Sequence, residues 1–246
     1  MDDNRKTILL TGASRGIGHA TVKRFSEAGW NVFTSSREEV PPECRRDPNW
    51  TQHIAADLGE PSEVGRFVDA VRILLDDKPL DALVNNAGVS PKSSLQERLG
   101  CLNGEIEDWR HVFELNFFTP LSLARGLSDP LTKGKGSIVN VTSIAGHNVH
   151  PFAGSAYSTS KAALSALTRE MAAEFAELGV RVNAVAPGEI NTAMLSPGTE
   201  SLIPKIPLHR LGTPEDVASA IFYLCSPESA YVNGTEIFVT GGQHIY

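Results

Sequence analysis

Short apolar runs that alternate with amphipathic segments are the feature of this 246-residue sequence that most restricts its fold. The runs are nearly uniformly apolar, as expected for strands that are covered on both faces of a parallel sheet. They lie at residues 7–10, 31–34, 53–56, 82–84, 137–141, 180–185 and 236–239. The segments between them, at 18–28, 62–75, 109–127, 156–178 and 214–224, have helical periodicity. The pattern predicts a doubly wound α/β fold in which helices flank a parallel sheet of about seven strands.

The whole chain, residues 1–246, is predicted to be one domain, because no linker, low-complexity block or repeat divides it. In such a Rossmann-type sheet, right-handed crossovers place the loops that follow the strands along one edge, where ligands bind. Two loops on this edge, residues 90–107 and 196–211, are longer than typical connections. We expect them to form walls or lids of a substrate pocket, and plain surface insertions are the alternative.

Composition excludes several classes of protein. The net charge of −7 argues against a general nucleic-acid binder, which needs a basic face. We expect no transmembrane helix, because about 18 uncharged apolar residues never occur in a row, and the acidic N-terminus does not resemble a signal peptide. Three scattered cysteines fit thiols in a reducing compartment, so the expected location is cytoplasmic. No metal is expected, since no carboxylate cluster accompanies His147 and His150.

A glycine-rich turn follows the first predicted strand and opens the first predicted helix. Glycines there permit a tight turn and let the backbone approach a pyrophosphate, which then lies at the positive end of a helix. The turn predicts a dinucleotide site, and a purely structural turn is the alternative. The expected cofactor-binding residues of this turn are Gly12, Ser14, Arg15, Gly16, Ile17 and Gly18.

The end of the second strand indicates which dinucleotide binds. An acidic residue about 20 positions after the glycine turn would accept the ribose 2′-hydroxyl of NAD, but Ser36 and Arg37 stand there instead. A hydroxyl beside a guanidinium suits a 2′-phosphate, and Arg15 offers a second cation. NADP(H) is therefore favoured. NAD(H) stays the alternative, because Glu38 and Glu39 follow directly and would repel a phosphate.

Tyr157 and Lys161 are four residues apart in a predicted helix and therefore share one face. A tyrosine with its ordinary pKa of about 10 is a poor acid or base near neutrality, and an adjacent ammonium would lower that pKa. Such pairs are also common on exposed helices. Ser143, at the end of the strand at 137–141, adds a hydroxyl that can reach a substrate carbonyl.

These residues belong to an ordered set of motifs that resembles a known family. The motifs are Thr11 to Gly18, Asn85-Asn86-Ala87-Gly88, Asn116, Ser143, Tyr157-x-x-x-Lys161 and Pro187-Gly188-x-Ile190-x-Thr192. The set is similar to that of the short-chain dehydrogenases/reductases, and the resemblance runs from Lys6 to Gly242. It implies an oxidoreductase that transfers a hydride between NADP(H) and a carbonyl or secondary alcohol substrate.

The resemblance also implies a role for each catalytic residue. Tyr157 is expected to be the general acid in reduction and the base in oxidation. Lys161 is expected to lower the pKa of Tyr157 and to bind the nicotinamide ribose. Ser143 is expected to hydrogen-bond the substrate oxygen. Asn116 is expected to hold a water that connects Lys161 to solvent, and a helix asparagine satisfied by the backbone is the alternative.

Further cofactor contacts are implied in the same way. Asp57, next to Leu58, is expected to accept a hydrogen bond from the adenine. The adenosine ribose is expected to lie against Asn85, Ala87 and Gly88, and the nicotinamide against Pro187, Gly188, Ile190 and Thr192. The loop between Ser143 and Tyr157 is one residue longer than usual in the family. We expect residues 147–152 to bulge into the pocket mouth, where His150 is a candidate substrate contact.

Two matters stay open in the sequence. The resemblance implies that the alanine-rich helix from Tyr157 to Phe175 packs against its copy in a homo-oligomer, a dimer or a tetramer, but a helix buried within one subunit would look similar. A nucleotide-binding sensor or scaffold with little catalysis is the alternative to an enzyme. The mixture of apolar and basic residues in the expected pocket walls does not identify the small-molecule substrate.

Overall fold

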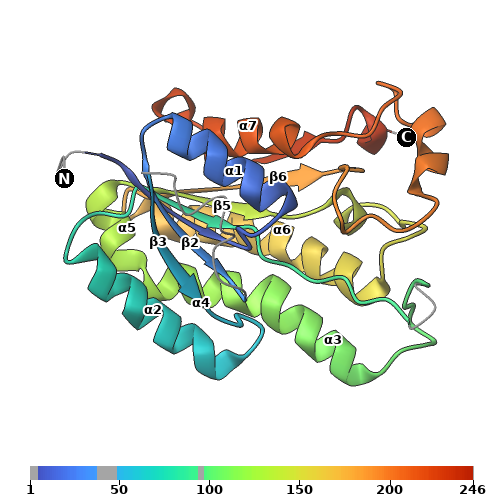
Figure 1. Cartoon of the computed structure of the whole chain (residues 1–246), viewed down its shortest axis with the longest axis horizontal. Coiled ribbons are helices and arrows are strands. Elements are labelled where there is room, and N and C mark those ends of the chain that lie inside the picture. The colour runs from blue at the N-terminus through green and yellow to red at the C-terminus, as the bar shows by residue number, and fades with distance from the viewer. Residues whose placement is uncertain (1–4, 38–48, 94–96, 246) are drawn as a thin grey trace.

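The computed structural model describes residues 5–37, 49–93 and 97–245, and in them one seven-stranded sheet forms the centre of the molecule (Figure 1). The strand order is β3-β2-β1-β4-β5-β6-β7, and neighbouring strands pair in parallel throughout. The strands are β1 (Thr7–Thr11), β2 (Asn31–Ser36), β3 (Trp50–Ala55), β4 (Ala82–Asn85), β5 (Ser137–Val141), β6 (Arg181–Pro187) and β7 (Glu236–Val239). The predicted doubly wound fold is confirmed.

Helices cover both faces of the sheet (Figure 1). On one face lie α1 (Gly16–Glu27) and α7 (Pro214–Cys225), and on the other lie α2 (Pro61–Leu75), α3 (Ile106–Phe113), α4 (Thr119–Gly126), α5 (Ser128–Gly134) and α6 (Ser155–Ala176). Short 3-10 turns occupy Ile144–Gly146, Thr199–Lys205, Pro227–Ser229 and Gln243–Ile245.

The helix predicted at 109–127 is interrupted. A π-helical turn, Glu114–Phe118, stands between α3 and α4, and the residues at both junctions keep helical backbone angles. The sequence prediction missed α5. Among the described residues, no helix is both long and apolar enough to cross a membrane.

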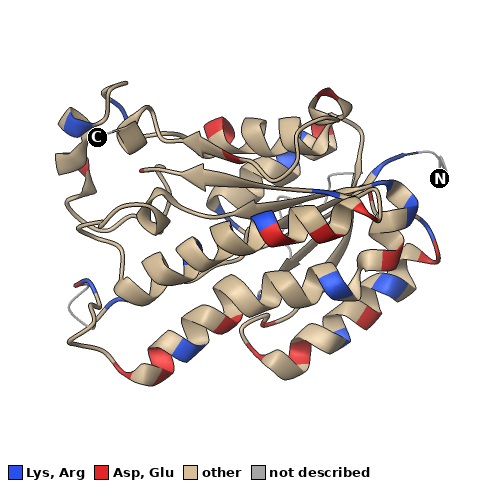
Figure 2. Ribbon diagram, turned by 180° about the vertical axis from the view of Figure 1, so that it is seen from behind, with Lys and Arg blue, Asp and Glu red and all other residues tan. Residues whose placement is uncertain are grey.

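The core has two layers because successive strand residues point to opposite faces. In β1, Ile8 and Leu10 pack with the cluster under α1 and α7, whereas Leu9 packs with the cluster under α2, α4 and α6. This two-sided burial explains why the strands are apolar without alternation. Charged residues lie mainly on the helices and loops around the sheet (Figure 2).

The strand order reverses between β1 and β4, which are neighbours in the sheet. Their following loops diverge to opposite faces, and a crevice opens at the carboxyl ends of such strands. The loops that contain most of the predicted site residues begin at this edge.

A buried chain of polar side chains fixes β4, β5 and α6 relative to one another. Asn85 Nδ2 donates to Asn140 Oδ1 at 2.8 Å, and Asn140 Nδ2 donates to Thr168 Oγ1 at 2.9 Å. All three side chains are buried. Since these elements also carry the loop after β4, Ser143 and Tyr157, the chain sets the spacing of the candidate site.

Replacing the middle residue, Asn140→Ala, is expected to lower the free energy of unfolding by about 2–3 kcal/mol, because the Asn85 amide is left buried without its acceptor. Chemical denaturation measures this. The control Asn148→Ala alters an exposed side chain and should change the stability by less than about 0.5 kcal/mol. An equal loss in both variants would contradict the importance of the buried chain.

Candidate active site

The turn between β1 and α1 approaches the loop after β4 too closely for any residue but glycine at two positions. Gly12 has a φ of +69°, and a Cβ there would lie 2.9 Å from Ala87 Cα. A Cβ on Gly18 would lie only 2.0 Å from the carbonyl oxygen of Gly12. The backbone therefore forms a cradle that a side chain would fill, as expected for a site that a phosphate approaches.

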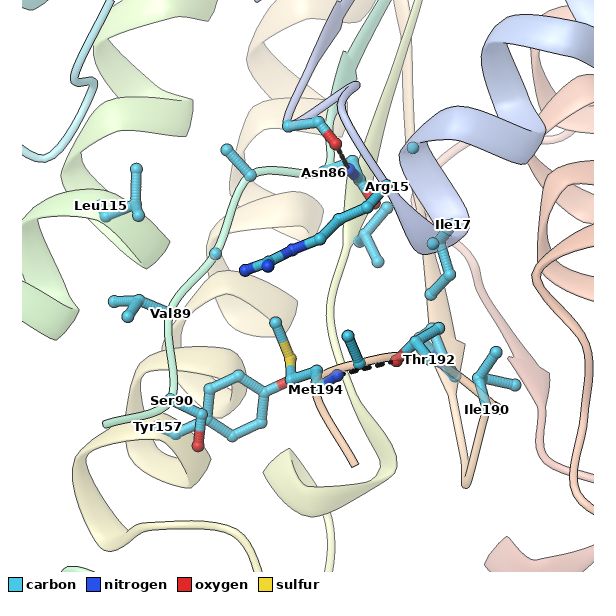
Figure 3. Close-up of a pocket in the computed structure, with 18 of the residues that line it drawn as sticks. Arg15, Ile17, Asn86, Val89, Ser90, Leu115, Tyr157, Ile190, Thr192 and Met194 are labelled. Carbon is cyan, nitrogen blue, oxygen red and sulfur yellow. Dashed lines mark hydrogen bonds between the residues drawn. The ribbon is translucent and has the colours of Figure 1, made fainter. Parts of the chain in front are cut away.

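Hydrogen bonds from Asn86 hold this cradle together. Its Nδ2 donates to the carbonyl oxygen of Thr11 at 3.0 Å and to that of Gly12, also at 3.0 Å; Figure 3 marks one hydrogen bond at Asn86. In return, Thr11 Oγ1 accepts from the backbone N–H of Asn86 at 3.1 Å and of Ala87 at 3.0 Å. The first turn of α1 has no capping side chain and no acidic residue. Its free N–H groups and positive helix end suit an anion.

A cavity of about 510 Å³ extends from this cradle along the carboxyl edge of the sheet. Most of the predicted site residues line it together. They are Gly12, Ser14, Arg15, Gly16, Ile17, Gly18, Ser36, Arg37, Asp57, Leu58, Ala87, Gly88, Tyr157, Lys161, Pro187, Gly188, Ile190 and Thr192. The glycine cradle and Tyr157 therefore line one continuous cavity.

The structure corrects the placement of Asn85. Its side chain does not line the cavity, because it points into the core and donates to Asn140, and it is only 2% exposed. The next residue, Asn86, points to the other side of the chain and does line the cavity. The sequence contains this pair side by side, and only the strand direction decides which amide faces the ligand space.

The two arginines lie on the part of the cavity wall near the glycine turn. The Arg15 side chain extends across the cavity (Figure 3), and Arg37 is exposed beside Ser36 at the end of β2. Ser36 Oγ lies 3.4 Å from His53 Nε2 on β3. Glu38 and Glu39, which the sequence suggested could repel a phosphate, lie outside the described residues. Asp57 Oδ1 accepts from the Gly59 N–H at 3.0 Å, so its carboxylate is held at the end of β3.

The predicted Tyr157, Lys161 and Ser143 come together where β5 ends against α6. Tyr157 and Ser143 share a hydrogen bond. Ser143 Oγ also accepts from the Ala145 N–H at 3.2 Å. Lys161 is buried; its Nζ donates to the Val141 carbonyl oxygen at 2.6 Å and lies 5.8 Å from the centre of the Tyr157 ring.

Burial shifts the pKa values of both ionisable groups. Desolvation raises the pKa of Tyr157 above its ordinary value; the hydrogen bond with Ser143 opposes this shift, and the charge of Glu189 adds to it. Desolvation lowers the pKa of Lys161 to about 8. The Lys161 ammonium donates to the Val141 carbonyl oxygen, and the lowering of the Tyr157 pKa by Lys161 stays a prediction. At neutral pH, Tyr157 is a protonated phenol that can donate.

Asn116 is fully buried in the π-helical turn and does not line the cavity. Its Oδ1 accepts from the Val89 N–H at 2.9 Å, and its Nδ2 donates to the Val89 carbonyl at 3.0 Å and to Ser160 Oγ at 3.1 Å. It thus ties the loop after β4 to α6. The expected water between Asn116 and Lys161 stays a prediction.

Both long segments contribute residues to the cavity wall, and their role in a substrate pocket stays a prediction. Ser90 and Lys92 come from the first, and Ser196 and Thr199 from the second. The bulging loop at 147–152 adds His150 and Phe152. His147 and His150 pair with different carboxylates, Glu236 at 2.9 Å and Glu189 at 2.5 Å.

Sequence reasoning missed several residues of the wall, above all Glu189. Others are Asn86, Val89, His111, Leu115 and Met194. Glu189 stands between Gly188 and Ile190, two residues after the end of the buried strand β6, where burial of a charge is unfavourable. This charged residue near the end of a buried strand is the feature of the sequence that could have identified Glu189 as a site residue.

Comparison with known proteins identifies relatives over nearly the whole chain. The sequence family described as enoyl-(acyl carrier protein) reductase matches residues 12–244. Protein FixR of Bradyrhizobium diazoefficiens is 53% identical over 242 residues, which cover 98% of this chain and 87% of that protein.

Solved structures of other proteins are also similar to this chain over nearly its whole length. A crystal structure of an oxidoreductase of the short chain dehydrogenase/reductase family from Brucella ovis, in complex with a partially ordered NAD, is similar with a TM-score of 0.82 and 48% identity. The match covers 96% of this chain and 99% of that one. The RhlG/NADP active-site complex of Pseudomonas aeruginosa is similar with a TM-score of 0.86 and 30% identity, covering 97% of this chain and 96% of that one.

Burying the Lys161 ammonium is expected to cost stability. Lys161→Met should therefore increase the free energy of unfolding at pH 7 by on the order of 2 kcal/mol, measured without ligand. The folded protein releases the Lys161 proton near pH 8, while the unfolded chain keeps it to about pH 10.4. The stability of the unsubstituted protein gains from this group as pH rises through that window, so the advantage of the methionine should shrink above pH 8.

The control for this measurement is Lys23→Met, which replaces an exposed lysine of α1. It should leave both the stability and its pH dependence nearly unchanged. A Lys161→Met variant that is less stable than the unsubstituted protein at every pH would contradict the lowered pKa.

Proposed function

The chain belongs to the short-chain dehydrogenase/reductase family, and from this premise we propose that it transfers a hydride between NADP(H) and a carbonyl or secondary alcohol substrate. Members of this family are NAD(P)-dependent oxidoreductases, and this chain is one of them. One observation carries the proposed chemistry: the Tyr157 phenol, hydrogen-bonded to Ser143 and one helical turn from Lys161, faces the same cavity as the glycine cradle.

In reduction, Tyr157 donates its proton to the substrate oxygen, and in oxidation it takes that proton back. When bound, NADP(H) supplies or accepts the hydride. The Ser143 hydroxyl donates toward the Tyr157 oxygen without substrate, and when a substrate binds it would turn to donate to the substrate oxygen beside Tyr157. The protonated state of Tyr157 at neutral pH favours the role of general acid.

Lys161 acts on the cofactor side. Its buried ammonium has Nζ near Gly88, where a Cβ would come within 3.4 Å of it. The absence of a side chain at Gly88 leaves room for ribose hydroxyls to reach Nζ. Asn116 positions Val89 and Ser160 around this lysine, and a water held by Asn116 would connect Lys161 to solvent in the proposed proton path.

The preference for NADP(H) rests on Arg15, Ser36 and Arg37, which line the cavity near the glycine cradle. Two guanidinium groups match the charge of a 2′-phosphate, and the RhlG relative is complexed with NADP. The adenine is expected to lie against Asp57 and Leu58. The second candidate is an NAD(H)-dependent enzyme, favoured by the NAD in the Brucella ovis relative, which is more similar in sequence.

A nucleotide sensor or scaffold is the alternative from another class. The name of the FixR relative states no reaction. A protein that only binds the cofactor would need the glycine cradle and Lys161 but gains nothing from a Tyr157–Ser143 pair. The enzyme is therefore the better proposal.

Assembly and location are part of the proposal. Ala166 and Ala173 are exposed on α6, and Phe118 is exposed on the neighbouring π-helical turn, which suits a homo-oligomer, a dimer or a tetramer, that packs these helices together. The free thiols of Cys101 and Cys225 suit the cytoplasm, where disulfides are rare.

Tyr157→Phe removes only the phenolic oxygen. It is expected to reduce the rate of NADPH oxidation with any reducible ketone at least about 100-fold, because the acid is lost, while the Kd for NADPH stays nearly unchanged. Steady-state kinetics and fluorescence titration of NADPH measure the two. Tyr223→Phe, in α7 outside the cavity, is the control and should retain full activity. Undiminished turnover in Tyr157→Phe would refute the mechanism.

Arg15→Ala and Arg37→Ala test the cofactor preference. Each is expected to raise the KM for NADPH roughly 10-fold, the equivalent of one charge-assisted hydrogen bond, and to leave the KM for NADH nearly unchanged. Arg66→Ala, an exposed arginine of α2, is the matched control. If the unsubstituted protein has the lower KM for NADH, the preference for NADP(H) is wrong.

A further inference from the structure

A buried carboxylate lies in the cavity wall beyond the residues of the proposed mechanism. Glu189 directly follows the Pro187-Gly188 pair at the end of β6, is 6% exposed, and lines the same cavity as Tyr157. Burial of a carboxylate is unfavourable unless a partner compensates its charge. The charge of the Glu189 carboxylate therefore requires a compensating partner.

Its partner His150 does not compensate this charge, because its hydrogen bonds define a neutral ring. His150 Nδ1 accepts from the backbone N–H groups of Phe152 at 3.2 Å and of Ala153 at 3.1 Å, so this nitrogen carries no proton. The proton is therefore on Nε2, which donates to Glu189 Oε1 at 2.5 Å. A neutral imidazole orients the carboxylate but leaves its negative charge in place.

Within the part of the chain that the structure describes, no lysine or arginine takes this role either. Among the residues that the structure describes, Glu189 forms no ion pair with a lysine or an arginine. Lys92, which also lines the cavity, donates to the Phe152 carbonyl oxygen instead. Glu189 Oε1 has a second, long contact of 3.5 Å with Gln243 Nε2, and Oε2 accepts no hydrogen bond within the described part of the chain. One carboxylate oxygen is thus left for a ligand.

The backbone around Glu189 is rigidly held. The Gly188 N–H donates to the Val239 carbonyl at 3.0 Å, and the Gly212 N–H donates to the Glu189 carbonyl at 2.8 Å. The Asn191 N–H donates to the Gly212 carbonyl at 2.9 Å. A carboxylate fixed by its backbone and by His150 is preorganised, so binding a donor requires little rearrangement.

The remaining wall near Glu189 is largely apolar. Phe152, Met194 and Leu195 line the same cavity. The negative charge of Glu189 is close enough to Tyr157 to raise the pKa of the phenol. Glu189 and Tyr157 line one cavity, so a substrate held at Tyr157 can also present a polar group to the Glu189 carboxylate and its bulk to the apolar side chains.

We propose that Glu189, oriented by His150, is a specificity-determining residue that accepts a hydrogen bond from a hydroxyl or ammonium group next to the reacting carbonyl. The preferred substrates are then α-hydroxy or α-amino ketones with an apolar remainder, and an anionic group at this position is rejected. This inference rests on the proposed function, and it names the substrate class of the same site.

Four aryl ketones of similar size test it with NADPH as the reductant: propiophenone, 2-hydroxyacetophenone, 2-aminoacetophenone with the amine on the α-carbon, and benzoylformate. The hydroxy or the amino ketone is expected to have a kcat/KM at least about 10-fold above that of propiophenone, as one hydrogen bond to a charged group implies. Benzoylformate should be the poorest of the four. Equal kcat/KM values for all four would overturn the inference and leave the proposed function intact.

Two variants separate the donor types. Glu189→Leu should abolish the preference, so that the ratio of kcat/KM for the hydroxy or the amino ketone to kcat/KM for propiophenone falls to about 1. Glu189→Gln keeps an acceptor oxygen but no charge, so it should retain a preference for the hydroxy ketone and lose one for the amino ketone. Glu27→Gln, an exposed carboxylate at the end of α1, is the matched control. A uniform loss on all four ketones in both variants would indicate a merely structural role and overturn the inference.

The pH profile supplies an independent readout. Removing the negative charge in Glu189→Gln should lower the pKa of Tyr157, so reduction should fall off at a lower pH than in the unsubstituted protein. A profile that does not move would contradict the closeness of Glu189 to the phenol. If propiophenone and the other ketones are not reduced at all although NADPH binds, the proposed function fails, and the inference fails with it.

Discussion

The close approach of the glycine turn after β1 to the loop after β4 holds the cavity together. Thr11 and Asn86 exchange hydrogen bonds across it, and the lack of a Cβ at Gly12 allows it. Since β1 and β4 are the strands at which the sheet reverses its order, this contact lies at the centre of the ligand edge. The loops after the strands on both sides of this contact line the same cavity, including the loop after β2 with Arg37 and the loop after β6 with Glu189.

Two ionisable side chains are buried at the substrate end of the cavity, where burial of a charge is unfavourable. Burial disfavours the charge on Lys161, and Glu189 is buried without a cation among the described residues. Within the described residues, each group is held by local hydrogen bonds, to the Val141 carbonyl for Lys161 and from His150 for Glu189, and these bonds leave its charge in place. Uncompensated charge in a cavity is available to a ligand, which connects the stability of this region to its proposed chemistry.

The fold was largely predictable because strands buried on both faces must be apolar throughout, and each of the seven predicted runs became a strand. The interruption of the predicted helix at 109–127 was not predictable, because one extra residue per turn leaves no periodic signature. The helix α5 was missed because it spans only Ser128–Gly134 and contains both proline and glycine. Asn85 was assigned to the cavity in place of Asn86, since side-chain direction depends on where the strand ends.

The sequence by itself determined the sheet, the glycine turn and the chemical identity of Tyr157, Lys161 and Ser143, because these depend on local residue type and spacing. Only the tertiary structure decided the electrostatics. Burial made Tyr157 a weaker acid than its ordinary form, directed the Lys161 ammonium to Val141, and brought Glu189 and His150 into the same cavity. Such effects depend on which groups from distant loops share a desolvated space, and residue spacing along the chain contains no measure of that.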